Sequence, residues 1–297
     1  MPPVDGTGGA RAGAAGPGAV LGLDAAWTPG NPGGAALAAF FGGRWTCLAV
    51  APDCGLFCDL AAGRLPEGGQ WTARRRGGPV DAAALLAACR TLLAGAGADA
   101  TVSVVAVDMP LSRVPLLTRR EADNAAARAL ARYRCGVHSP VPGRPGLLGA
   151  DFTNSFIGQG FPLAVGDCRP VPALLEVYPH AVFLALQLEH GGVARQQARR
   201  FAYKAGRSRQ YWPEASKAVR IARLLAQFET ARRWLGRELL LPPLPLPPAG
   251  ATTLAGLKPL EDGLDALACC VMGIRYLAGR ARGLGDATGA IWVPEEL

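Results

Sequence analysis

The sequence has no long hydrophobic run and no repeat period. No stretch of 18 apolar residues occurs, and the best candidate, Leu264 to Leu277, contains Asp265 and Arg275, so we expect no membrane-spanning helix. Gly (39) and Pro (25) cluster near the start and in a few loops without periodicity, which excludes collagen-like and solenoid proteins. Residues 1–18 lack the apolar core of a secretory signal, so we expect a disordered leader and a cytoplasmic protein.

Cysteine pairs with the spacing of a zinc site or a disulfide framework are also lacking. The eight cysteines are scattered, and none forms a CxxC pair. With no export signal, we expect reduced thiols that serve as small buried hydrophobic residues. The only ligand-like spacings join Cys54 to Cys58 and Cys135 to His138, which leave a zinc site open as an alternative.

Composition and charge favour a folded protein with one strongly basic segment. The 297 residues are 50% hydrophobic and 18% charged, which suits one large domain or two small ones and excludes a disordered chain. The formal net charge is +8, and residues 195–238 hold twelve basic residues against three acidic ones. This segment is either a solvated helix face or a surface that binds a phosphate backbone.

The spacing of apolar residues predicts a mixed α/β fold, in which a mixed sheet is flanked by helices. Strands are expected at 19–24, 34–41, 44–50, 101–107, 174–178 and 290–293, and helices at 80–93, 118–134, 214–235 and 259–280. Gly42-Gly43 is typical of a hairpin turn. Residues 135–172 are expected to be loop, and 239–250 a proline-rich connector. We therefore expect a single domain over 19–294, with an insertion of helix and loop around 111–172 and the basic helical region at 195–238.

Carboxylates interrupt the hydrophobic pattern at several strand and helix positions. Asp24 and Asp108 each end a predicted strand, Glu176 lies inside one, and Asp262 and Asp265 share one face at the start of the last helix. A buried carboxylate is costly unless it is paired or bound to a cation. If the strand ends converge, divalent metal ions would satisfy several of these groups together.

Each of these acids also has a purely structural interpretation. Asp24 and Asp108 could form turns or caps where their strands end. Asp262 could interact favourably with the helix dipole. Glu176 has the weakest structural explanation, because an acid inside a strand needs a paired charge or a ligand.

Several short motifs, taken in order, resemble a known protein family. They are Gly22-Leu23-Asp24-Ala25-Ala26-Trp27, Asn31-Pro32-Gly33-Gly34-Ala35, Val107-Asp108-Met109-Pro110-Leu111, Arg120-x-x-Asp123 with Arg128, Glu176-Val177-Tyr178-Pro179, Tyr203-Lys204-x-Gly206-Arg207, Asp262-x-x-Asp265-Ala266-Leu267 and Gly289-Ala290-Ile291-Trp292-Val293-Pro294. In this order they are similar to the domain-of-unknown-function family 429, described as predicted RNase H-like nucleases. The resemblance runs from about residue 19 to residue 294.

The resemblance implies an RNase H-like fold, with acids from the first strand, a later strand and a C-terminal helix gathered around metal. The expected activity is metal-dependent hydrolysis of phosphodiester bonds in nucleic acid. The expected catalytic residues are Asp24, Asp108, Glu176 and Asp265, and the expected ligands of Mg²⁺ or Mn²⁺ are Asp24, Asp108, Asp262 and Asp265. Arg120, Tyr203, Lys204 and Arg207 are expected to bind the substrate.

Two other functions stay open on the sequence. One is a non-catalytic nucleic-acid or protein-binding module that keeps the fold. The other is an actin-like ATPase or phosphotransferase, which would need phosphate-binding hairpins in both halves of a duplicated domain, and no second copy follows residue 150. Among the aromatic residues, Trp27, Tyr178, Tyr203 and Trp212 could stack bases or belong to the core. His180 could orient a ligand or be an ordinary satisfied histidine.

Overall fold

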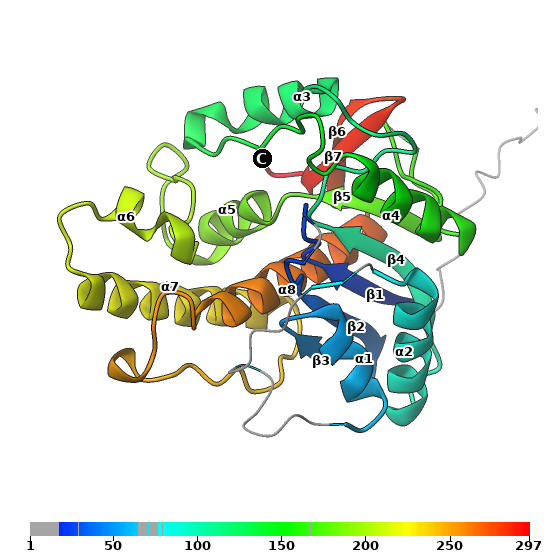
Figure 1. Ribbon diagram of the computed structural model, residues 1–297, viewed down its shortest axis with the longest axis horizontal. Helices are drawn as coiled ribbons and strands as arrows, with labels where there is room; N and C mark the ends of the chain where they lie inside the picture. Colours follow the sequence, from blue (N-terminus) through cyan, green and yellow to red (C-terminus); the bar gives the residue numbers. More distant parts are fainter. Residues whose placement is uncertain (1–17, 29, 65–70, 72–76, 79, 167) are drawn as a thin grey trace, which may run out of the picture.

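A seven-stranded mixed sheet forms the centre of the protein (Figure 1). The computed structural model describes residues 18–28, 30–64, 71, 77–78, 80–166 and 168–297. The strand order is β3 (Arg44–Ala51), β2 (Ala35–Phe41), β1 (Gly18–Leu23), β4 (Thr101–Val107), β5 (Ala173–Val177), β7 (Gly289–Pro294) and β6 (Ala281–Asp286). Strands β1, β4, β5 and β7 are parallel, whereas β2, β3 and β6 each pair antiparallel with a neighbour.

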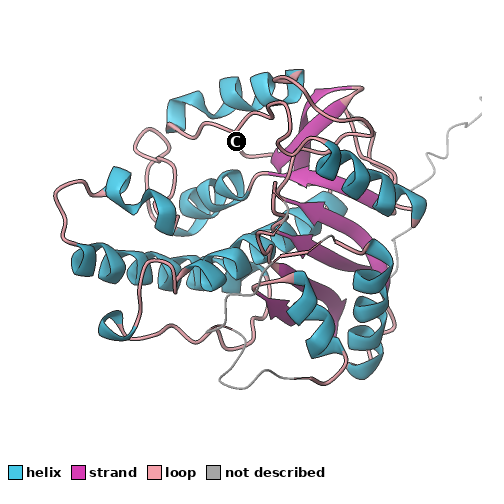
Figure 2. Ribbon diagram, in the orientation of Figure 1, coloured by secondary structure: helices cyan, strands magenta, loops and turns pink. Residues whose placement is uncertain are grey.

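Helices cover both faces of the sheet (Figure 2). One face packs against α1 (Cys54–Ala61), α2 (Ala82–Gly95) and α4 (Leu147–Gly158), and the other against α5 (Pro179–His190), α7 (Lys217–Glu238) and α8 (Lys258–Leu277). Helix α3 (Glu121–Leu130) packs on β6 and β7. Short turns of helix complete the chain: η1 (Ala131–Tyr133), η2 (Ala205–Arg207), α6 (Ser208–Tyr211) and η3 (Ala249–Ala251).

The two faces follow from the alternation of side chains along each strand. In β1, Val20 packs with the α8 side, whereas Leu21 and Leu23 pack with the α2 side. Every residue from Ala19 to Leu23 is apolar and buried, as expected for a strand that is covered on both faces. Gly42 and Gly43 both have positive φ, of 59° and 81°, and form the tight turn between β2 and β3.

Helix α8 lies unusually close to the sheet because two glycines leave room for it. A Cβ atom on Gly22 of β1 would lie 2.2 Å from the carbonyl oxygen of Ala266, and one on Gly273 would lie 2.4 Å from Val20 Cγ1. Almost the whole helix is therefore buried, including Glu261, Asp262, Asp265 and Arg275. Each of those charges needs a partner inside the protein.

The structure confirms the α/β class and most of the predicted elements. The predicted strands correspond to β1 to β5 and β7, and the predicted helices to α2, α3, α7 and α8. The interpretation of 135–172 as loop was wrong in part, because α4 lies within it. Its two internal glycines and its Asn and Ser residues hide the helical pattern.

Helices α1 and α5 and strand β6 were not predicted. In α5, eight successive residues from Pro179 to Leu186 are buried, so the helix has no polar face that would show a helical period. The expected leader over residues 1–18 lies outside the described residues, except that Gly18 begins β1. Within the described part of the chain, no helix has the length and apolar character needed to cross a membrane.

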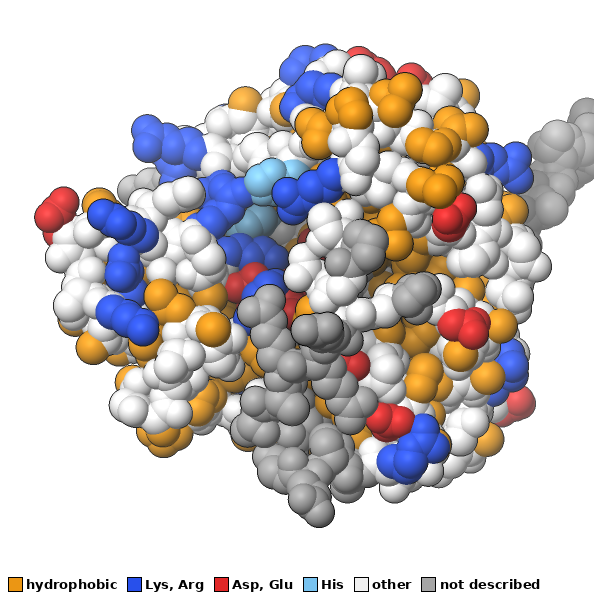
Figure 3. All heavy atoms as spheres, viewed as in Figure 1, with side chains coloured by type: hydrophobic (Ala, Val, Ile, Leu, Met, Phe, Trp, Pro, Cys, Tyr) orange, Lys and Arg blue, Asp and Glu red, His pale blue; other side chains and the backbone are white. Residues whose placement is uncertain are grey.

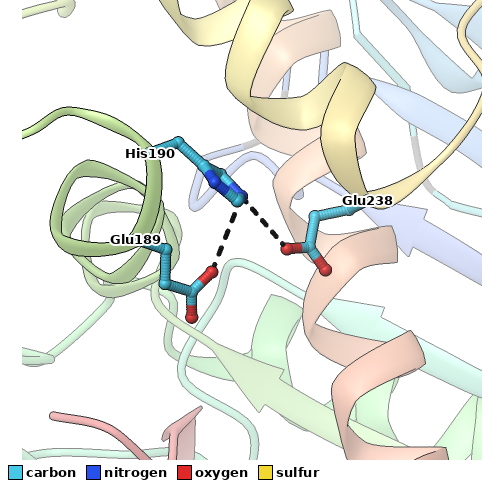
Figure 4. Close-up of side chains that lie close together, drawn as sticks. All are labelled: Glu189, His190 and Glu238. Carbon is cyan, nitrogen blue, oxygen red and sulfur yellow. Dashed lines mark ion pairs between the residues drawn. The ribbon is translucent and has the colours of Figure 1, made fainter.

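A buried arginine joins three helix ends and the C-terminal segment. The Arg275 guanidinium of α8 is fully buried and pairs with Glu189 of α5 at 2.6 Å, Glu238 of α7 at 2.8 Å and Glu296 at 3.3 Å. Figure 4 shows His190 between Glu189 and Glu238. Its Nε2 atom lies 3.7 Å from each of these two carboxylates. Arg275 thus fixes the far ends of the helices that cover this face.

We expect Arg275→Leu to lower the free energy of unfolding by about 2–4 kcal/mol, because it leaves three carboxylates without their buried cation. Urea denaturation measures the change. The matched control is Arg232→Leu, which removes an ion pair to Glu229 in which both side chains are about 40% exposed. That exposed pair should contribute less than about 1 kcal/mol, and an equal loss in the two variants would contradict the expectation.

Candidate functional site

Two neighbouring parallel strands end in aspartates at one edge of the sheet. Leu23 of β1 pairs in register with Val107 of β4, and Asp24 and Asp108 follow them directly. The Asp108 N–H donates to the Leu23 carbonyl at 2.8 Å, so the parallel ladder continues to the aspartates. The carboxyl ends of adjacent parallel strands meet at one edge, which explains why these two acids come together.

The first turns of α8 bring further carboxylates to the same place. One oxygen from each of Asp24, Asp262 and Asp265 can be chosen so that the three lie within 4.8 Å of one another. Asp262 and Asp265 are 1% and 0% exposed, whereas Asp24 is half-buried. Asp108 lies beside this trio and borders the same cavity as Asp24 and Asp262.

Two glycines allow the chain to close around these acids. A Cβ on Gly34 would lie 2.2 Å from the carbonyl oxygen of Asp262, and one on Gly33 would lie 2.1 Å from that of Asp24. The Asp24 N–H also donates to the Gly34 carbonyl at 2.9 Å. The Gly33-Gly34 pair therefore lets the chain entering β2 pass directly over the aspartates.

Two lysines partly neutralise the group. Lys258 donates to Asp262 and, at 3.0 Å, to Glu261, while Lys204 donates to Asp265 and lies 3.7 Å from Glu261. The Ala205 N–H also donates to Glu261 at 2.6 Å. Asp24, Asp108, Glu261, Asp262 and Asp265 together carry five negative charges when ionised, and the lysines carry two positive ones. Three negative charges remain unbalanced.

The pKa values of these acids reflect their burial and the excess of negative charge. Burial, followed by the charge of Asp24, raises the pKa of Asp108 and of Asp262 well above the ordinary aspartate value. Burial also raises the pKa of Asp265 to about 6, although Lys204 opposes the shift. Burial alone would raise the pKa of Glu261, but Lys204 and Lys258 hold it below the usual value. A bound cation would relieve the repulsion between these groups.

Tyr203 lies under the acids and orients one of them. Its hydroxyl donates to Asp265, and its ring is fully buried against Phe183, Phe201 and His180. A substrate-binding role was expected for Tyr203, but the structure places the ring in the core and off the cavity wall. Its neighbour Lys204 does border the cavity, as expected for a substrate-binding residue.

Glu176 and Arg120 form a separate ion pair. The Arg120 guanidinium donates to both carboxylate oxygens of Glu176, at 2.6 and 2.7 Å, and also to Asp123 at 2.8 Å. The Leu111 N–H donates to Glu176 at 2.9 Å. Glu176 borders the cavity, but it is already paired with Arg120, whose side chain is only 10% exposed. Arg120 of the Arg120-x-x-Asp123 motif therefore pairs with the glutamate inside the strand. Its guanidinium is not free to bind a phosphate.

Asp24, Asp108 and Asp262 border a cavity of about 630 Å³. Its wall contains carboxylates from the cluster and, from other segments, cationic and aromatic side chains that include Trp27, His138, Arg144 and Arg207. Figure 3 shows histidine, basic and acidic side chains gathered around a hollow in the middle of this face. The cavity therefore combines acids that suit a cation with cations that suit an anion.

The donor set fits a hard divalent cation such as Mg²⁺. All candidate ligands are carboxylate oxygens, which Mg²⁺ prefers over nitrogen or sulfur. The negative charge of the five carboxylates also exceeds the positive charge of the two lysines.

Lys258, Glu261, His138 and Arg144 were not predicted as site residues. The three-residue spacing of Lys258 and Glu261 on a helix was an available signal, His138 was considered only as a zinc ligand with Cys135, and Arg144 lies in irregular chain.

A second group with ligand-like distances has a different explanation. Glu189, His190 and Glu238 lie close enough to share an ion, but Arg275 already pairs with both glutamates. Among the described residues, no cysteine belongs to a group with metal-ligand geometry. Five of the eight cysteines are buried, as expected for small hydrophobic residues.

Comparison of the chain with protein-family models, with curated proteins and with solved structures found no match.

We expect Lys258→Met to make the protein more dependent on Mg²⁺. The substitution leaves four unbalanced negative charges, so the metal-free variant should lose about 1–3 kcal/mol of unfolding free energy. Mg²⁺ should restore more of the melting temperature in this variant than in the wild type, because a bound ion stabilises only the folded state. Thermal unfolding in EDTA and over a Mg²⁺ series measures both effects.

The matched control is Lys217→Met, which removes an exposed lysine at the start of α7. It should leave the Mg²⁺ dependence unchanged. The same Mg²⁺-induced shift in Lys258→Met, Lys217→Met and the wild type would show that the carboxylates near Lys258 do not bind the ion.

Proposed function

We propose that this protein hydrolyses phosphodiester bonds in nucleic acid with the help of Mg²⁺ or Mn²⁺, on an RNase H-like fold. The observation that carries the proposal is the group of Asp24, Asp262 and Asp265, in which one oxygen from each residue lies within 4.8 Å of the others, beside Asp108. The motif resemblance implies acids from the first strand, a later strand and a C-terminal helix. The strand ends of β1 and β4 and the first turns of α8 supply acids in that arrangement.

In this proposal Asp24, Asp262 and Asp265 hold the metal, and Asp108 is a further ligand. Divalent ions in such sites activate water and stabilise the charge that develops on phosphate oxygens. Tyr203 and Lys204 fix the Asp265 carboxylate, and Lys258 fixes Asp262, so the ligands are ordered before an ion binds.

The protein's own cations have separate tasks. Arg207 borders the cavity and has no ion pair with a described carboxylate, so its guanidinium is available to a substrate phosphate. Glu176 and Arg120 fix the segment around Leu111 beside the site, and no chemical step is assigned to them.

A basic surface continues away from the cavity along η2, α6 and the first part of α7. Arg200 lies over the Tyr211 ring and Arg223 over the Trp212 ring, each at 5.7 Å, and Lys and Arg side chains gather over this side of the molecule in Figure 3. The apolar stripe of Ile221, Leu224, Phe228, Ala231 and Leu235 faces the core. The opposite face is therefore free to bind a phosphate backbone.

The second candidate function is a nucleic-acid-binding module without catalysis. It is favoured by the two lysines, which already pair with Asp262 and Asp265 and so lower the need for a metal ion. Nucleic-acid binding that persists in EDTA, without cleavage in any divalent ion, would support it.

Asp24→Asn removes one carboxylate from the proposed metal site. We expect Asp24→Asn to weaken Mg²⁺ and Mn²⁺ binding at least tenfold and to reduce cleavage by about 100-fold or more, because it removes one carboxylate charge from the ion. Calorimetry measures binding, and a screen over single-stranded, duplex, hybrid and branched nucleic acids measures cleavage.

Asp151→Asn on α4 is the control, because Asp151 is exposed and lies outside the cluster. It should change neither quantity. Metal binding by the wild type that is unaffected by Asp24→Asn would refute the assignment of the ion to this group.

Arg220 and Arg223 of α7 belong to the basic surface. Reversing Arg220 and Arg223 to Glu should weaken nucleic-acid binding, and should reduce the slope of log K against log salt by about two, because two phosphate contacts are lost. Arg90 and Arg113 are exposed arginines away from this surface, and reversing them is the control for net charge. Equal losses in the two double variants would show that only net charge matters.

A further inference from the structure

One wall of the cavity has the features of a nucleotide subsite. Trp27 is half-buried, follows β1 by four residues and borders the cavity. The Arg144 guanidinium lies 5.7 Å from its ring centroid, and the His138 ring meets it edge-on at 6.3 Å. A ring with a loosely placed guanidinium over it offers a surface on which a planar base can stack.

The cations of this wall differ from those near the floor. Lys204 and Lys258 are paired with carboxylates, whereas Arg144 and Arg207 form no ion pair with a described carboxylate. The His138 ring touches Arg207, and burial followed by the nearby arginines lowers its pKa, so the ring is neutral at pH 7. The two guanidinium groups are thus available for a negatively charged ligand.

A buried polar atom at the same cavity also has no partner among the described residues. His180 is 6% exposed and borders the cavity, and its Nδ1 atom makes no hydrogen bond to any residue that the structure describes. The ring is held in place by Tyr178 and Tyr203, at centroid distances of 5.5 and 5.1 Å. An unsatisfied buried nitrogen is costly, and a ligand with a polar group at this position would satisfy it.

The dimensions limit which nucleic acid can use these groups. The cavity of about 630 Å³ is of the size that encloses a small-molecule ligand, which corresponds to one or two nucleotides. Glu261 and Asp262 at its floor are buried, and a base of a duplex approaches such a floor only when it is out of the stack.

We infer that the cavity binds one nucleotide of a single strand, with its base on Trp27 and its phosphate between Arg144 and Arg207. Single-stranded nucleic acid is then the substrate class of the proposed phosphodiesterase, on which this inference rests. The incoming base displaces the Arg144 guanidinium from the indole face and leaves it free to contact the phosphate. His180 hydrogen-bonds a polar group of the same nucleotide.

Fluorescence anisotropy with a short labelled single strand and its matched duplex tests the inference, in EDTA to prevent cleavage. We expect the single strand to bind at least tenfold more tightly than the duplex. Trp27→Leu should raise the single-strand dissociation constant by roughly 5- to 100-fold and leave duplex binding unchanged. Arg144→Gln should weaken single-strand binding and reduce its salt slope by about one.

The controls keep the overall fold and charge comparable. Trp45→Leu removes a half-buried tryptophan on β3 that does not border the cavity, and Arg90→Gln removes an exposed arginine on α2. Neither should change single-strand binding.

His180→Phe keeps an aromatic ring against Tyr178 and Tyr203 but removes both nitrogens, and it should raise the single-strand dissociation constant about fivefold. Melting temperatures confirm that each variant is folded.

Two results would overturn the inference: duplex binding as tight as single-strand binding, or a dissociation constant that Trp27→Leu leaves unchanged. Failure of the proposed hydrolysis has a different signature. In that case the single strand still binds in a Trp27-dependent way, but it is not cut in Mg²⁺ or Mn²⁺. Metal-dependent cleavage of duplex that is insensitive to Trp27→Leu would leave the hydrolysis standing and refute the subsite.

Discussion

The close contact between α8 and β1 is the constraint on which the rest of the structure depends. Gly22 and Gly273 remove the side chains that would separate the helix from the strand. The approach buries a helix with acids at its start and an arginine near its end. Because buried charges need partners, the neighbouring elements must supply them, and they do so in different ways at the two ends.

At the far end of α8 the buried charge is a cation, and the side chains of its carboxylate partners are 11–34% exposed, so they still reach solvent. Arg275 is shared by glutamates from α5, α7 and the C-terminal segment, so the network ties these elements together. At the start of α8, Lys204 and Lys258 balance only part of the negative charge. The far-end network stabilises the fold, whereas buried carboxylates beside a cavity are suited to binding a cation.

The same contrast separates the two kinds of cations near the site. Arg120 is fully engaged by Glu176 and Asp123, so a motif that reads as a phosphate clamp in sequence serves to neutralise a strand glutamate. Arg144 and Arg207 come from irregular chain and a short turn, and they border the cavity without carboxylate partners. Availability of a charge, rather than its presence in a motif, decides whether it can bind a substrate.

Local sequence patterns predict the α/β class, most of the strands, and the grouping of Asp24, Asp108, Asp262 and Asp265. Those predictions succeed because strand periodicity, turn glycines and acids in apolar surroundings are local signals. The tertiary structure alone decided that Glu176 pairs with Arg120, that α5 is a buried helix, and that Trp27, Arg144 and His180 share a cavity. These facts depend on contacts between distant segments, and no local pattern encodes which buried charge finds a partner in the fold.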